Sequence, residues 1–364
     1  MDVKRVGTGI IIIITLFVWG GCSKSPTGPA GGGWTFELVD AGSQMGWHSS
    51  LTTTSDGTVH ILYHDGYELT LNHARRIAPD VWERTRLDTI GWKGEDVAVS
   101  CGLGDTLHIA YRDMFVKDLR YARYDGTDWV YDRLDPFRAT GEEVIIDSRS
   151  DGVHMLELKD DSNQLNYWHG GLENWNLVSY IHINGPRPTL ALAQGPAGPV
   201  LSLFATQTSY SRSVQKYDLL LYTADDPAGP WVKTTLISDL LRTDYSYQSL
   251  AMDFDEMGQL HLLYRLTDGD LHDMAGSRVA REVEAGRVRI NRGPGGDLWA
   301  LYPISDGFGL SNFRGGVWRR MTSINALNHL GKWAMHIDGE GTVHISVYSH
   351  SGHRFWYGRW EPGA

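Results

Sequence analysis

Short apolar runs, each about five residues long, recur along the chain and are separated by turns rich in glycine and aspartate. Val59–Tyr63 is typical: it holds β-branched and aromatic residues and follows a turn that ends at Gly57. Such runs favour strands over helices. Seven runs share the pattern: Val59–Tyr63, Leu107–Tyr111, Val153–Glu157, Val200–Phe204, Leu260–Tyr264, Leu298–Tyr302 and Val343–Val347.

A second pattern is a strand that begins with tryptophan and ends with aspartate. Trp34–Asp40, Trp82–Asp88 and Trp129–Asp135 are close copies, and looser copies begin at Trp175, Trp231 and Trp318. The interval between Trp231 and Trp318 has room for two units with one tryptophan missing, so Trp34 to Trp318 spans six units of about 47 residues each. Each interval also has room for one strand before and one after the apolar run, so the repeating unit has four strands.

Four strands in about 47 residues are typical of a β-propeller blade. The seven apolar runs therefore predict an all-β, seven-bladed β-propeller with four-stranded blades over residues 33–364. The last unit ends at Arg354–Trp360 without a tryptophan strand. We expect the N-terminal strand Trp34–Asp40 to complete the last blade and to leave no open sheet edge.

Composition and charge narrow the possible partners. The chain carries 42 glycines, 14 tryptophans and 17 tyrosines, which suits short strands joined by tight turns. Its net charge of −11 argues against nucleic acid as a partner. We expect a monomer.

Residues 1–21 have the organisation of a secretory signal, with Lys4 and Arg5 before the apolar run 10–18. Small residues directly before Cys22 resemble the lipobox of bacterial lipoproteins, which implies cleavage before Cys22 and its lipidation. Residues 22–32 then form a flexible linker. This predicts a protein lipid-anchored in the bacterial cell envelope, at the periplasmic or surface side of the outer membrane, with contact to the membrane only through the anchor. A plain secretory signal and an uncleaved anchor are the alternatives.

The repeats also resemble the sialidase-type, BNR-like propellers of secreted bacterial proteins. The resemblance covers nearly the whole mature chain and implies the blade architecture. The Asp-box of sialidases and their arginine triad are absent from the sequence. Sialidase activity is therefore not expected.

The repeat separates scaffold residues from candidates for function. One histidine recurs at the same position of the second strand, and we expect these copies to be structural, bonded to backbone or side chains between blades. The copies are His60, His108, His154, His261 and His344. We expect Cys101 to be a buried structural thiol. No metal ligands and no cofactor are assigned, although Asp253 and Asp255 leave calcium open.

One face of a propeller carries the turns between second and third strands and the connections between blades, and analogy with other propellers places a ligand there. Cations and aromatic side chains in these loops suit an acidic glycan. The candidate ligand-binding residues are Tyr67, Asp65, Lys159, Arg187, Tyr247, Arg265, Lys332 and His350. A glycan or other small-molecule ligand at this face is the expected function.

Two alternatives remain open. His48, His64 and Arg112 resemble the active site of propeller polysaccharide lyases of the ulvan type, which implies a histidine base and an arginine that neutralises a uronate carboxylate. The matching position of the second blade lacks that family's tyrosine. A glycoside hydrolase could use two loop carboxylates instead. The third class is a protein-binding envelope scaffold. We favour a binding protein over an enzyme.

Overall fold

The computed structural model describes residues 33–42, 45–88, 93–113, 115–135, 143–159, 164–171, 174–182, 189–195, 198–206, 215–224, 230–242, 250–266, 268–284, 286–325, 333–349 and 352–362. Strands make up nearly all of its regular structure, and the one helical turn in these ranges is a 3-10 turn at Leu103–Asp105. No helix in the described ranges is long and apolar enough to cross a membrane.

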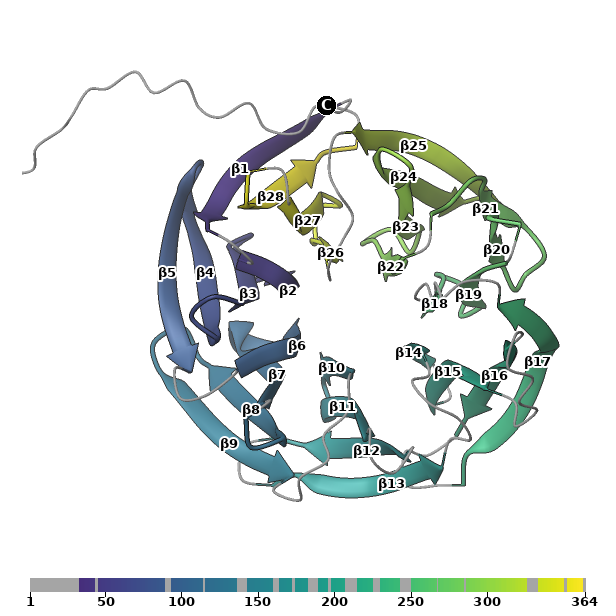
Figure 1. Ribbon diagram of the computed structural model, residues 1–364, viewed down its shortest axis with the longest axis horizontal. Helices are drawn as coiled ribbons and strands as arrows, with labels where there is room; N and C mark the ends of the chain where they lie inside the picture. The colour runs from purple at the N-terminus through teal and green to yellow at the C-terminus, as the bar shows by residue number, and fades with distance from the viewer. Residues whose placement is uncertain are drawn as a thin grey trace, which may run out of the picture.

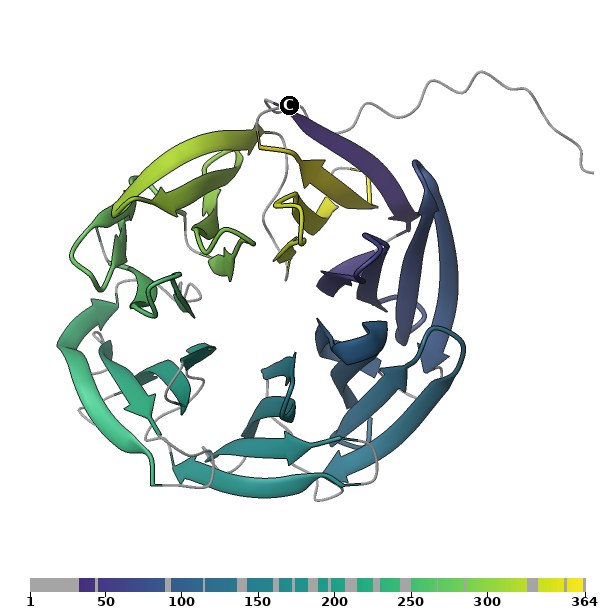
Figure 2. The same cartoon turned by 180° about the vertical axis from the view of Figure 1, so that it is seen from behind.

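The described strands pair into seven antiparallel sheets of four strands each, arranged around a central axis (Figure 1; Figure 2 gives the view from behind). We number these blades by chain order. The first three are β2 (Met45–Thr53), β3 (Val59–Asp65), β4 (Thr70–Ala78) and β5 (Val81–Asp88); β6 (Lys93–Cys101), β7 (Leu107–Asp113), β8 (Asp118–Tyr124) and β9 (Trp129–Asp135); and β10 (Val144–Arg149), β11 (Gly152–Lys159), β12 (Gln164–Gly170) and β13 (Asn176–His182).

The fourth to sixth blades follow the same order. They are β14 (Thr189–Gly195), β15 (Gly198–Thr206), β16 (Gln215–Thr223) and β17 (Val232–Arg242); β18 (Leu250–Phe254), β19 (Leu260–Arg265), β20 (Leu271–Asp273) and β21 (Arg278–Ala280); and β22 (Arg289–Arg292), β23 (Leu298–Ile304), β24 (Gly307–Arg314) and β25 (Val317–Asn325).

The seventh blade joins the two ends of the described chain. Its strands are β26 (Ala334–Ile337), β27 (Val343–Ser349), β28 (Arg354–Trp360) and β1 (Trp34–Ala41). Strand β1 pairs antiparallel with β28, with Trp34 opposite Trp360, and forms the outer edge of this blade (Figure 1). Non-local pairing therefore closes the ring.

The hydrophobic core lies between neighbouring blades. Strand β3 is buried along its whole length because both of its faces pack against other sheets. In the seventh blade, Trp34 and Trp360 pack with 6.4 Å between their ring centroids, and Trp299 from the sixth blade lies 5.5 Å from Trp360. These tryptophans therefore pack within and between blades, where their large rings bury much apolar surface.

Candidate functional site

The innermost strands of all seven blades line a central channel with a volume of about 720 Å³. This volume lies within the usual range of small-molecule sites. First strands begin at the face that carries the turns between second and third strands, and we call that end the mouth of the channel. His48, Asp96 and Glu143 line the channel close to where their strands begin.

An ion pair joins two blades across the mouth. Arg287 of the sixth blade lies 3.1 Å from Glu143 of the third, and their side chains are 19% and 14% exposed. Arg289, two residues further on, also lines the channel. Burial and the positive charge of Arg287 lower the pKa of Arg289 to about 10, against the opposing effect of Glu143. The channel mouth thus concentrates charge in a restricted volume.

The two histidines proposed for catalysis lie together. The rings of His48 and His64 meet edge to face with 6.1 Å between centroids. Burial lowers the pKa of His64 to about 4, so its imidazole is neutral at pH 7, and its Nε2 is buried without a hydrogen-bond partner. His48 Nδ1 accepts a hydrogen bond of 3.3 Å from the Asp96 backbone N–H. His48 faces the channel and His64 lies behind it.

The lyase arrangement needs side chains that can reach a substrate. His64 is 4% exposed and Arg112 is 7% exposed. An arginine that neutralises a substrate carboxylate has to contact that carboxylate directly. Of the proposed trio, His48 has the greatest access to the channel, and Arg112 lies buried within the second blade.

Asp65, predicted to contact the ligand, holds a turn instead. It is 2% exposed, and one carboxylate oxygen accepts the N–H groups of Tyr67 and Glu68, both at 2.9 Å. Asp113 of the second blade accepts from Phe115 and Val116 in the same way. The ligand assignment of Asp65 is corrected: its oxygen satisfies two turn N–H groups that would otherwise lack partners.

These turns present aromatic side chains to solvent. Tyr67 and Phe115 occupy equivalent positions in the first and second blades, and each is 77% exposed. A buried carboxylate fixes the backbone beneath each ring. The prediction of Tyr67 as a ligand contact is compatible with this exposure, whereas the sequence reading did not single out Phe115.

The remaining candidates divide into two groups. Arg265 Nε donates to the Val283 carbonyl at 2.6 Å, so this arginine anchors a loop within the fifth blade. Lys159 ends β11 and pairs across the sheet with Gln164, beside the turn to the third strand. The other predicted residues lie outside the described residues: Cys22, Arg187, Tyr247, Lys332 and His350.

The recurrent histidines are structural, as predicted, but their bonds lie within blades and not between them. Nδ1 of each meets a third-strand side chain of the same sheet: His73 for His60, Tyr121 for His108, Tyr167 for His154, Asp273 for His261 and Tyr357 for His344, at 2.5–2.9 Å. In three blades Nε2 also meets a turn carboxylate. The histidine therefore ties its own hairpins together.

Several groups bear on metal binding and reactivity. One carboxylate oxygen of Asp255 accepts hydrogen bonds from the N–H groups of Met257 and Gln259 in a turn, whereas Asp253 lines the channel. The two carboxylates therefore lie in different surroundings, and calcium binding by this pair stays a prediction. Cys101, expected to be buried, is half-buried and lines the channel. Partial burial raises the pKa of its thiol to about 11, which lowers its reactivity. Two other groups in the described chain bring three possible metal ligands together: Asp151, His154 and His169, and Asp268, Asp270 and His272.

Sequence reasoning missed the charged residues of the mouth. The predicted ligand residues lie in loops or at strand ends near them, whereas Arg289 begins the first strand of the sixth blade and Arg287 lies just before it. Comparing the first strands of the repeats would have found Arg289, because it occupies the position that Ala251 holds in the fifth blade.

Comparisons with known proteins place the fold among all-β propellers. No family model matches the chain, and no curated protein matches it. A glycoside hydrolase of Fusarium graminearum, the GH93 α-L-arabinofuranosidase in complex with arabinobiose, is similar in structure with a TM-score of 0.51 and 9% identity. The similarity covers 89% of this chain and 96% of that one.

A variant of the Aleuria aurantia lectin in complex with Fucα1-6GlcNAc aligns with a TM-score of 0.50 and 10% identity over 78% of this chain and 96% of that one. Another structure of this lectin, with a TM-score of 0.49, is described as a six-bladed β-propeller. The described strands of this chain pair into seven sheets, whereas that lectin has six blades. At these identities the comparisons support the coarser class, an all-β propeller.

Proposed function

We propose that this protein is a lipid-anchored, extracytoplasmic propeller that binds an acidic glycan at the mouth of its central channel. The observation that carries the proposal is Arg289. It lines the channel, and its guanidinium makes no hydrogen bond or ion pair in the part of the chain that the structure describes, although the charge of Glu143 acts on it.

Arg289 is half-buried. A partly desolvated cation without a partner is unfavourable, and an anion beside it removes much of that cost. The lowered pKa of Arg289 expresses this cost, because burial and Arg287 both disfavour its charge. A uronate carboxylate accepts two parallel hydrogen bonds from a guanidinium. The charge at the mouth therefore favours an acidic sugar over a neutral one.

Aromatic rings on the same face suit the rest of a polysaccharide. Tyr67 and Phe115 stand on equivalent turns of adjacent blades and are largely exposed. Flat rings stack on pyranose faces and bury apolar surface at little entropic cost, since the supporting turns are already fixed. A chain anchored at Arg289 could extend across these turns.

Two further points support the proposal more generally. The structural neighbours named above were solved with a fucoside and with arabinobiose. The lipobox-like sequence before Cys22 would hold the propeller at the bacterial outer membrane, where glycans are accessible. Metabolic labelling with a fatty-acid analogue tests the anchor: label should appear on the wild-type chain and disappear in Cys22→Ser.

The decisive experiment measures binding of uronate oligosaccharides and matched neutral oligosaccharides by calorimetry. We expect uronates to bind and Arg289→Gln to lower their affinity by about 10–100-fold, the usual range for a hydrogen bond to a charged group. Arg319→Gln, an exposed change on the outer strand of the same blade, is the matched control. Equal binding of neutral sugars, or unchanged affinity in Arg289→Gln, would contradict the proposal.

A lyase is the second candidate, and the edge-to-face contact of His48 and His64 is the observation that favours it. The same oligosaccharides are monitored for ultraviolet absorbance of unsaturated uronates. Absorbance that grows with the wild type and disappears in His48→Ala would establish β-elimination. Binding without new absorbance assigns a lectin-like role.

A further inference from the structure

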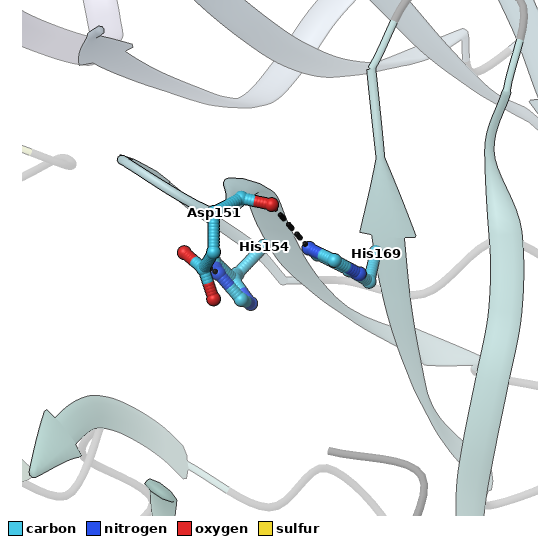
Figure 3. Close-up of side chains that lie close together, drawn as sticks. All are labelled: Asp151, His154 and His169. Carbon is cyan, nitrogen blue, oxygen red and sulfur yellow. Dashed lines mark hydrogen bonds and ion pairs between the residues drawn. The ribbon is translucent and has the colours of Figure 1, made fainter. Parts of the chain in front are cut away.

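We propose a binding site for a divalent transition-metal ion of the zinc class in the third blade, formed by Asp151, His154 and His169. Figure 3 shows the three side chains gathered at the turn between the first two strands and the end of β12. One possible ligand atom from each residue lies within 4.8 Å of the others. Two imidazoles and one carboxylate are a common ligand set for zinc and similar ions.

The contacts within the cluster have the spacing of a coordination shell. Asp151 Oδ1 lies 3.0 Å from His154 Nε2, and the Asp151 carbonyl oxygen lies 3.2 Å from His169 Nε2. With metal–ligand bonds of about 2.0–2.1 Å, adjacent ligands are about 2.9–3.4 Å apart in octahedral and tetrahedral sites. An ion would replace the protons that these atoms now share, and rotation of the stacked imidazoles would direct both lone pairs towards it.

The surroundings prepare the ligands. Tyr167 Oη lies 2.5 Å from His154 Nδ1. In the tautomer in which Nδ1–H donates a hydrogen bond to this hydroxyl, the lone pair on Nε2 is available to an ion.

The repeat distinguishes this cluster from the other blades. The same pairing of histidine and turn carboxylate occurs at His344 and Asp338 and at His261 and Asp255, so the pair alone serves the scaffold. His169 lies directly opposite His154 across the sheet. The residues opposite the recurrent histidine in three other blades are Arg75, Arg123 and Arg359. A guanidinium there repels a cation, and in the third blade an imidazole takes its place.

The backbone makes room for this imidazole. Gly152 has φ +137°, and a Cβ at this position would lie 2.8 Å from His169 Nε2. Asp151 is 55% exposed on its side chain whereas His154 is 1% exposed, so the cluster opens to solvent on one side. It lies at the opposite end of β11 from the channel mouth, about 23 Å away along a strand of eight residues. The metal site is thus separate from the proposed glycan site.

The test uses the full chain purified without a polyhistidine tag and titrated with Co²⁺, whose visible absorption reports ligand geometry. We expect one saturable ion per chain, displaced by Zn²⁺. His169→Arg introduces the residue that three other blades hold at this position, so it is compatible with the fold, and it should lower the affinity at least about 100-fold. Asp151→Asn, an exposed change, should also lower it, and His182→Ala on the exposed edge strand of the same blade should leave it unchanged.

Thermal melts of all variants verify that they are folded. A wild-type chain that does not bind one Co²⁺ saturably would overturn the proposal. It would also be overturned if His169→Arg or Asp151→Asn bound the ion as tightly as the wild type. Loss in both of these variants with retention in His182→Ala is the supporting result.

Discussion

The buried ion pair between Glu37 and Arg76 joins the seventh blade to the first, where the ring closes. Arg76 donates to both oxygens of Glu37, with contacts of 2.6–3.1 Å. The two side chains are 9% and 17% exposed. We predict that Glu37→Gln destabilises the protein strongly, because it leaves the guanidinium beside a neutral amide that can accept from one side only.

The magnitude follows from the burial of the pair. Removing one partner of a buried ion pair costs about 3–5 kcal/mol. Arg76 keeps some solvent contact and glutamine retains one acceptor, so we expect the lower end, about 3 kcal/mol. The matched control is Glu83→Gln, which breaks the pair of Arg75 and Glu83 on the surface of the first blade, where the side chains are 36% and 55% exposed. Exposed pairs contribute about 0–1 kcal/mol.

Urea unfolding, followed by tryptophan fluorescence, measures both variants. Arg76→Met and the double variant complete a thermodynamic cycle, and the double variant should cost less than the two single changes together, because it leaves no unpaired charge. The reasoning is refuted if Glu37→Gln costs no more than Glu83→Gln, or if the two single changes are additive.

Two further predictions concern pH and backbone conformation. Burial lowers the pKa of several histidines, so below pH 6.5 the unfolded chain binds more protons than the folded chain. The stabilisation is therefore fully present above pH 6.5 and is lost as the pH falls towards 4. The loss is up to about 1.4 kcal/mol per pH unit for each histidine. The histidines with a pKa of about 4 are His60, His64, His108 and His336. Urea midpoints measured from pH 7 to pH 4.5 check this, and a flat profile would contradict it. Gly307→Ala should destabilise the sixth blade severely, because φ is +140° and the new Cβ would lie 1.9 Å from the Ile324 carbonyl oxygen. Gly315→Ala, with φ +61° and open space around the new Cβ, should cost only about 1 kcal/mol. Thermal melts of both glycine variants measure the difference, and equal losses of stability would contradict the prediction.

The repeat made the blades predictable from the sequence. The second strands were placed almost to the residue, since Val59–Tyr63 lies within β3 and Leu107–Tyr111 within β7. Their apolar side chains pack against both neighbouring sheets, so burial preserves the pattern in the sequence. Polar positions were harder to assign. Asp65 was assigned to a ligand because it is an acid in a loop, but hydrogen bonds to N–H groups two and three residues further on determine its role.

The limits of the site prediction have a similar physical cause. His48 and His64 were expected at one face, and the structure places their rings in contact. The burial of His64 and Arg112 depends on how blades pack against each other, which strand order alone does not specify. Arg289 was missed because its surroundings are a property of the assembled channel. Its lack of a hydrogen bond or ion pair with the described residues depends on how seven blades come together, which the sequence of one strand does not specify.

The same logic explains why the two proposed sites occur where the repeat is broken. At the channel mouth, the position held by Ala251 in the first strand of the fifth blade is held by Arg289 in the sixth. On the face of the propeller away from the channel mouth, His169 pairs across the sheet with the recurrent histidine of the third blade. Three other blades have an arginine at this position. Each change introduces a group that the scaffold does not require: in one case a cation with no hydrogen bond or ion pair among the described residues, and in the other a third possible metal ligand. Since the blades fold with the common residue at each position, restoring that residue should remove binding while preserving stability. A change that removes binding and stability together would instead assign the residue to the scaffold.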